Sequence, residues 1–315
     1  MKATLAGVAV AALAALAVAF VDPYLRLLAA QLAVVVIAVV SLNLLGNVAG
    51  MLSLASAAFM GLGGYGALIF MTIYNVPIVV SVPLAVALGG LVGWLMGLAA
   101  MRLSGINLAI VTFGFIEIFQ VFAKQGGAFS GDGYGLVLPP IDIPLIGPLT
   151  PDLTAVACVF VAVVVVALTR TLTRSRIGRA WYAMKENPVA AEMQGVRLLQ
   201  TRAQAFAVAG ATASLAGVLQ AFLLGITNPN LYVIDVSISH LSMMVVGGSS
   251  GGVAGAVLGP AVLFFVPEFL DLGRYKEVLY GSALLATLAI APQGLAGVWG
   301  YATRAAASVQ SRRRQ

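Results

Sequence analysis

Long apolar runs separated by short polar or Pro/Gly-rich breaks dominate the chain. Each run approaches the length that a helix needs to cross a hydrocarbon core, where backbone groups must be paired within the helix. We therefore predict an all-α, polytopic membrane helical bundle of about nine or ten segments, some of them Gly-broken or re-entrant. The predicted helices cover Leu5–Phe20, Leu27–Leu45, Gly50–Ile73, Ile78–Ala100, Ile106–Ala123, Leu153–Thr171, Ala203–Ile226, Val253–Leu270 and Val278–Ala291.

One further run, Val236–Val246, is shorter than the others. It is bounded by Asp235 and the pair Gly247-Gly248, and as a helix it would be only about 16 Å long. That length is too short to cross a bilayer alone. We predict a half-helix or re-entrant segment here.

Glycine interrupts one apolar stretch in each half of the chain, Gly46–Gly66 in the first and Gly247–Pro260 in the second. In transporters such pairs mark the substrate site, because broken backbone at membrane depth must be buried or line a wet cavity. Close helix packing by small residues is the alternative. The candidate pathway residues are Ser53, Ser56, Phe59, Thr112, Glu117, Gly247, Gly248 and Ser249.

Glu117 is a carboxylate inside a predicted span, where a central acidic residue costs about 2.5–3.5 kcal/mol. We expect a role in the pathway or its gate, or else a protonated or hydrogen-bonded structural acid near Gln120. His240 is the only histidine, which excludes a multi-histidine metal site and suggests a helix-interface residue.

Two glycine motifs need a separate interpretation. Gly61–Gly66 satisfies the dinucleotide pattern GxGxxG, but no strand pattern precedes it and no carboxylate lies between Asp22 and Glu117, so nucleotide binding is excluded. Gly89, Gly93 and Gly97 form tandem GxxxG at helical spacing, which indicates a helix contact, with a partner subunit as one candidate.

Composition supports a membrane protein. Hydrophobic residues make up 61% of the 315 residues and charged residues only 9%, against about 25% in soluble domains. We expect one membrane domain over residues 1–315. The start, Lys2–Phe20, has signal-peptide features, but its apolar run is long and the next begins almost at once, which favours a retained span. Cys158 is the only cysteine, so neither a disulfide nor a cysteine metal site can form within one chain.

The net charge of +6 predicts membrane topology and contact with anionic membrane lipids rather than nucleic-acid binding. Basic residues collect in loops that would share one side, which by the positive-inside rule is the cytoplasm. Only Arg26, Lys124, Arg274 and Lys276 then lie outside. We predict an N-in, C-in topology with a periplasmic loop at 124–152, a cytoplasmic coupling segment at 173–202 and a basic cytoplasmic tail at 301–315.

The cytoplasmic segment contains a short helix with clear end signals. Asn187 suits the N-cap, Pro188 the first helical position, and Gly195 the position past the end. Isolated helices of this length are marginal in water. The pattern therefore indicates that a partner protein supplies the missing packing, with a plain solvated connector as the alternative.

Several stretches of the chain resemble the branched-chain amino acid ABC transporter permease family, most closely its LivM-type subunits. Gly178–Gly195 is similar to that family's ATPase-contacting loop. Ser41–Gly46 with Gly50–Tyr65 is similar to its LNLLxGxxGxxSLGHAAFxGxGAY block, although Ala55-Ser56 replaces Gly-His. Asn107–Ile118 is similar to YFAIxTLAFxEI, and Ser130–Leu136 to an external TGGxxGL turn.

The resemblance implies a second permease subunit, two cytoplasmic ATPase subunits and a periplasmic substrate-binding protein as partners. It implies no cofactor in this chain, with ATP and Mg bound by the ATPase. The implied ATPase-coupling residues are Gly178, Arg179, Glu186, Asn187, Pro188, Ala190, Ala191 and Gly195. The implied docking residues for the binding protein are Phe129, Asp132 and Tyr134.

An enzyme is not expected, because neither a zinc-binding His/Glu pattern nor a serine elbow occurs, and no glycine precedes a lysine as a P-loop requires. The expected function is the permease subunit of an ATP-driven importer in the bacterial inner membrane, for branched-chain amino acids, working by alternating access. The same machinery could carry urea, short amides or other amino acids. A stand-alone secondary transporter is the alternative from another class.

Overall fold

The helices of the computed structural model follow the predicted apolar runs closely. The structure describes residues 22–100, 103, 105–143, 147–248 and 252–269, and in addition 278–279, 281–282, 285 and 287. The predicted span Leu5–Phe20, most of Val278–Ala291, the tail at 301–315 and Ser249 lie outside the described residues. The all-α fold is confirmed for the part of the chain that the structure covers.

Six helical stretches in the described ranges are long and apolar enough to cross a membrane. They are Pro23–Val48 (α2, Pro23–Asn43, with the π-helical turn η1, Leu44–Val48), Ile78–Ala99 (α4), Ile106–Gln125 (α5), Pro151–Thr173 (α6), Leu198–Leu224 (α9) and Pro229–Gly247 (the 3-10 turn η4, Pro229–Tyr232, with α10, Ile234–Gly247). Two shorter apolar helices accompany them, Ser56–Thr72 (α3) and Gly255–Phe269 (α11). This is a multi-pass membrane architecture.

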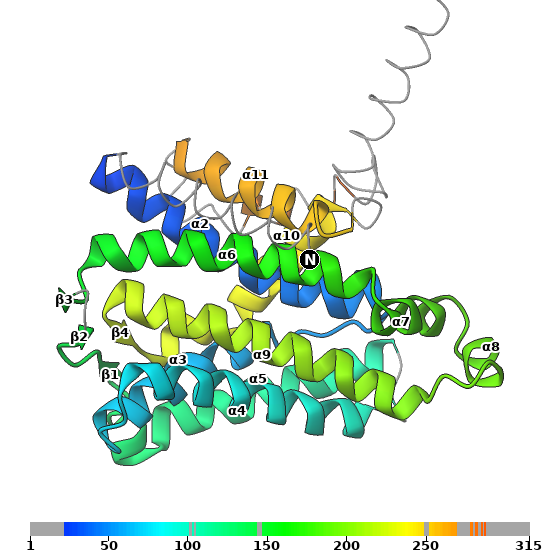
Figure 1. Cartoon of the computed structure of the whole chain (residues 1–315), viewed down its shortest axis with the longest axis horizontal. Coiled ribbons are helices and arrows are strands. Elements are labelled where there is room, and N and C mark those ends of the chain that lie inside the picture. The colour runs from blue at the N-terminus through cyan, green and yellow to red at the C-terminus, as the bar shows by residue number, and fades with distance from the viewer. Residues whose placement is uncertain are drawn as a thin grey trace, which may run out of the picture.

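The prediction of one helix over Gly50–Ile73 is wrong at its start. The chain leaves helical geometry after Val48, and α3 begins only at Ser56. Gly50 has a φ of 71°, a left-handed conformation that an α-helix cannot include. The non-helical residues 49–55, called the break below, therefore separate α2 from α3 (Figure 1).

Helix α2 is the central helix of the bundle. Of its most apolar window, 72% is buried, against 22% for α4. It packs against α6, α9, α10 and α11, and Figure 1 shows it running behind α6. Every residue of its second half, from Val36 to Asn43, is buried, as expected for a helix segment enclosed by others, whereas its first turn is exposed.

Close helix crossings explain most of the glycine motifs. Gly89, Gly93 and Gly97 on α4 face Ser214, Phe206 and Ala203 of α9, which lies beside α4 in Figure 1. The predicted helix contact is confirmed, but its partner is α9 of the same chain. Gly63 lies inside α3 against the backbone of Ser214, so the GxGxxG stretch is a helix-packing face.

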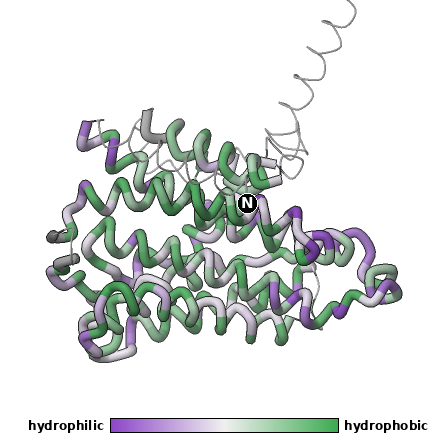
Figure 2. Tube along the Cα trace, viewed as in Figure 1, coloured by the Kyte–Doolittle hydropathy of each residue, from purple (hydrophilic) through white to green (hydrophobic). Residues whose placement is uncertain are grey.

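The two ends of the bundle differ in structure. At one end β1 (Leu136–Val137) pairs with β4 (Ile226–Thr227), and β2 (Asp142–Ile143) with β3 (Gly147–Pro148), after the 3-10 turn η3 (Gly127–Phe129). At the other end α7 (Arg176–Glu186) and α8 (Pro188–Met193) project from the spans (Figure 1). Figure 2 shows hydrophilic residues gathered around α7 and α8.

Candidate functional sites

The break brings together polar side chains from three helices. Ser56, the first residue of α3, lies 2.7 Å through Oγ from Nδ1 of the buried His240 on α10. Thr112 Oγ1 on α5 accepts a hydrogen bond from the Leu54 amide at 3.0 Å, and Ser237 Oγ accepts one from the Ala57 amide at 2.9 Å. Side chains of α5 and α10 therefore pair backbone groups that the break leaves without a helical partner.

Ser53 and Phe59 complete this region. Ser53 Oγ accepts from the Ala55 amide at 3.2 Å within the break. Phe59 is buried one turn into α3, its ring 5.3 Å from that of Phe115, and its carbonyl accepts from Ser214 Oγ at 2.8 Å. The predicted pathway residues Ser53, Ser56, Phe59 and Thr112 thus gather around the break, while the hydroxyls are already engaged within the chain.

Gly247 and Gly248 lie apart from this cluster, at the end of α10. A Cβ on Gly247 would overlap with the carbonyl of Gly255, and one on Gly259 with that of Met243, so α10 and α11 cross in backbone contact. Close packing accounts for these glycines. A pathway role for Gly247 and Gly248 stays a prediction.

Helix α7 connects the projecting end to the break. Trp181 is fully buried and donates a hydrogen bond through Nε1 to Thr201 O of α9 at 3.0 Å. Trp181 and Met184 pack in one apolar cluster with Val48, Ala49 and neighbouring apolar residues. The sequence analysis did not identify α7, although Gly178, Trp181 and Met184 recur every third residue as one helix face does.

A second contact lies at the end of the same helix. Lys185 Nζ donates to Asn47 O in the π-helical turn at 2.9 Å. The Lys185 stem lies over Gly50, where a Cβ would come 2.7 Å from Lys185 Cγ. Helix α7 is therefore in direct contact with the start of the break.

Helix α8 has the predicted end signals. The Asn187 side chain accepts from the Ala190 amide at 3.1 Å, Pro188 is the first helical residue, and Gly195 follows the helix with a φ of 84°. Gly178 and Ala191 are buried, and a Cβ on Gly178 would overlap with Thr173 O, which gives Gly178 a packing role between α6 and α7. The other predicted coupling residues, Arg179, Glu186, Asn187, Pro188, Ala190 and Gly195, are exposed.

A family model described as "Branched-chain amino acid transport system / permease component" matches residues 24–288. The chain belongs to this permease family. The match spans the described helices and both candidate sites, and it confirms the resemblance seen in the sequence.

Known relatives agree with the assignment. The permease is 27% identical over 288 residues to the high-affinity branched-chain amino acid transport system permease protein LivM of Escherichia coli (strain K12). This alignment covers 81% of this chain and 65% of LivM. It is 24% identical to the probable branched-chain amino acid transport permease protein LivH of Methanocaldococcus jannaschii, over 78% of this chain and 82% of LivH. The autoinducer 2 import system permease protein LsrC of Shigella flexneri is 28% identical, over 64% of this chain and 57% of LsrC.

The permease therefore spans 65% of the length of the LivM relatives that it matches. No solved structure shows a significant match. Its relatives are named as permease components of transport systems, which are transport subunits rather than enzymes.

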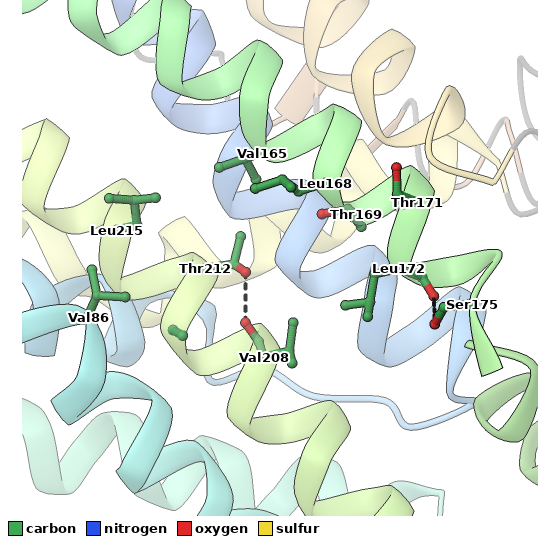
Figure 3. Close-up of a pocket in the computed structure, with 11 residues that line it drawn as sticks. Val86, Val165, Leu168, Thr169, Thr171, Leu172, Ser175, Val208, Thr212 and Leu215 are labelled. Carbon is green, nitrogen blue, oxygen red and sulfur yellow. Dashed lines mark hydrogen bonds between the residues drawn. The ribbon is translucent and has the colours of Figure 1, made fainter. Parts of the chain in front are cut away.

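Two cavities between the helices of the permease are unsuited to a zwitterion. One of about 500 Å³ lies between α4, α6 and α9 (Figure 3), and the hydroxyls of Thr171, Ser175 and Thr212 on its wall donate to carbonyls of their own chain segments. Another of about 210 Å³ is lined by Gln220 and His240 among mostly apolar side chains. Among the described residues, no charged side chain lines either cavity to pair with an ammonium or carboxylate group.

Glu117 faces away from the core of the permease. Its side chain is exposed on α5, and Phe113, Ile118 and Val121 beside it are exposed as well. A carboxylate on such an apolar face is costly in contact with lipid. The α5 face is therefore better suited to a protein or aqueous surface than to acyl chains.

The predicted docking residues lie at the strand-bearing end. Phe129 and Tyr134 are exposed, Tyr134 by 87%, and Asp132 is exposed with a φ of 52°. The loop that carries them is tied to the body through the β1–β4 pairing. These side chains belong to the loop predicted at 124–152, and their contact with a binding protein stays a prediction.

Proposed function

We propose that the permease is the membrane subunit of an ATP-driven importer of branched-chain amino acids in the bacterial inner membrane. It works by alternating access, with both termini in the cytoplasm. Family membership and the names of the LivM and LivH relatives support this cargo. ATP and Mg are bound by a separate ATPase subunit.

The contact between α7 and the break carries the proposal. Two cytoplasmic ATPase subunits move α7 and α8 when they close on ATP. Lys185 and Trp181 pass that motion to the break, because Lys185 bonds to Asn47 O just before it and lies over Gly50, and Trp181 packs in one cluster with Ala49. The hydrogen bonds of Leu54 to Thr112 and of Ser56 to His240 then redirect α5 and α10.

The exposed face of α5 meets the second permease subunit in this proposal. Glu117 then lies at the subunit interface, where a translocation pathway is wet and an amino-acid ammonium group can pass a carboxylate. The exposed position of Glu117 supports this placement. A liganded periplasmic binding protein docks at the opposite end, on Phe129, Asp132 and Tyr134.

A different cargo is the second candidate. The LsrC relative is named for import of autoinducer 2, so the family serves chemically distinct substrates. Urea, short amides and other amino acids are further candidates. Uptake of radiolabelled leucine by cells that express the permease together with its partner subunits, with unlabelled competitors in excess, separates these cargoes.

Affinity purification of the tagged permease in mild detergent, followed by mass spectrometry, tests the assembly. We expect an ATPase with a P-loop and a second permease to co-purify, and leucine uptake by reconstituted vesicles to require ATP on the cytoplasmic face. Recovery of the permease alone, together with uptake driven by an ion gradient, would establish a secondary transporter instead.

A further inference from the structure

A cationic cavity lies beside α7, outside the proposed pathway. It has a volume of about 370 Å³ and is lined by Arg170, Thr173 and Arg174 of α6, Tyr182 of α7, Val166, and the turn Gly252–Ala254 before α11. Among the residues that the structure describes, no aspartate or glutamate lines it. Neither arginine forms an ion pair with any residue that the structure describes.

The two arginines favour an anion between them. Arg170 and Arg174 are one helical turn apart, so their like charges face the same cavity and destabilise each other. Their position at the C-terminal end of α6 accounts for cations there in general, through the helix dipole. The helix dipole does not account for the cavity that the two arginines line. A phosphate bound by their guanidinium groups would fill this cavity.

Part of the cavity wall is apolar, formed by Val166, Val253 and Ala254. From there Ala254, Leu258 and Val262 form an exposed stripe along α11, each one turn further on. A ligand that suits both parts has an anionic head and an acyl tail.

We propose that this cavity binds the phosphate of an anionic phospholipid, with one acyl chain along the stripe of α11. The lipid touches Tyr182 of α7, one turn before Glu186, so it also supports the helix that contacts the break. An acidic surface of a partner ATPase fits less well, because the cavity lies between α6 and α11 while α8 projects further from the bundle (Figure 1).

Native mass spectrometry of the purified full-length permease, with the subunits it retains, tests the proposal. Delipidated protein is titrated with phosphatidylglycerol, phosphatidylcholine or inorganic phosphate. We expect one phosphatidylglycerol to bind about tenfold more tightly than phosphatidylcholine, given the attraction of anionic lipid to two arginines. Inorganic phosphate should not compete at millimolar concentration. Equal binding of the two lipids, or competition by phosphate, would overturn a phospholipid site.

Charge-neutral variants locate the site. Arg170→Gln with Arg174→Gln should lose the preference for phosphatidylglycerol, whereas Arg176→Gln with Arg197→Gln, exposed arginines of the same end, should keep it. Equal loss in both pairs would show a general charge effect and refute the site. Loss of ATPase capture with unchanged lipid binding would assign the cavity to the ATPase.

A steric variant covers the case in which the arginine pair fails to fold. Ala254→Trp fills the cavity and keeps both arginines, and it should reduce phosphatidylglycerol retention while Ala183→Trp, on an exposed part of α7 that does not line the cavity, should not. Retention in Ala254→Trp equal to wild type would contradict the proposal. Lipid binding is measured without ATP or cargo, so its outcome is independent of the transport assignment.

Discussion

Individual polar side chains hold the break in place. Ser56, Thr112, Ser237 and His240 are buried. Thr112 accepts a hydrogen bond from the Leu54 amide of the break, Ser237 accepts one from the Ala57 amide of α3, and Ser56 and His240 pair with each other. Such side chains are costly in a bilayer unless paired, and here the amides of Leu54 and Ala57 and the pairing of Ser56 with His240 supply the partners. These hydrogen bonds give the side chains a structural role, and a pathway role for Ser56 and Thr112 stays a prediction.

Ser56→Ala tests the importance of the pairing with His240. The change leaves a buried imidazole nitrogen without its partner, so we expect a loss of about 1 kcal/mol in the free energy of unfolding. Unfolding in sodium dodecyl sulfate, followed by circular dichroism, measures it. Ser239→Ala is the control, because Ser239 Oγ donates only to Asp235 O of its own helix. A similar loss in both variants would argue against a specific role for the pair.

Glu117→Gln tests the proposed pathway. The variant keeps the size of the side chain and removes its charge from an exposed position, so folding should be unchanged. We expect leucine uptake to fall by about tenfold, equivalent to about 1.4 kcal/mol of lost interaction with the ammonium group. Asp22→Asn removes an exposed carboxylate before α2 and should retain full uptake. Normal uptake by the Glu117 variant would exclude it from the pathway.

At the scale of elements, the permease consists of apolar spans and one amphipathic connection. α7 buries Gly178, Trp181 and Met184 on one side and leaves Ile177, Arg179 and Tyr182 to solvent or partners. α8, only six residues long, makes few contacts of its own, and α7 holds it in place. Helices α7 and α8 therefore form one unit, which is attached to the rest of the bundle through Lys185 and Trp181.

Lys185→Met tests this attachment. It keeps most of the stem that lies over Gly50 and removes the hydrogen bond to Asn47 O. We expect ATP hydrolysis by the assembled complex to persist while uptake falls several-fold, since one charged hydrogen bond is worth about 1.5–3 kcal/mol. Arg176→Met removes an exposed cation of the same helix and should preserve uptake. Loss of hydrolysis in step with uptake would place Lys185 at the ATPase contact instead.

At the scale of the whole molecule, the strand-bearing loop and the α7–α8 pair lie at opposite ends of the bundle (Figure 1). This arrangement suits docking partners on opposite sides of a membrane. The arrangement does not determine which end faces the cytoplasm. The distribution of basic residues favours the cytoplasm for α7 and α8.

Labelling with a membrane-impermeant maleimide tests that choice in intact spheroplasts. Tyr134→Cys and Met193→Cys place thiols at positions exposed by 87% and 86%. We expect Tyr134→Cys to react in intact spheroplasts and Met193→Cys only after permeabilisation. Cys158 is buried, so the wild-type chain should give low background. The reverse pattern would invert the topology.

The sequence by itself determined most of the spans and the ends of α8. A span depends on the length and hydrophobicity of one continuous run, and a cap depends on residues three apart, so both are local properties. Asn187, Pro188 and Gly195 therefore adopt the predicted positions. The motifs of the permease family are also continuous stretches, so the sequence alone indicated the family to which the chain belongs.

Only the tertiary structure decided which helices meet at the break. Lys185 and Asn47 are 138 residues apart, and Ser56 and His240 are 184 apart. Nothing in the local pattern of either residue specifies such a partner. The same applies to Gly89, Gly93 and Gly97, whose spacing predicted a contact but could not identify α9. Partner choice depends on how the whole bundle packs, and that packing connects the projecting helices to the break.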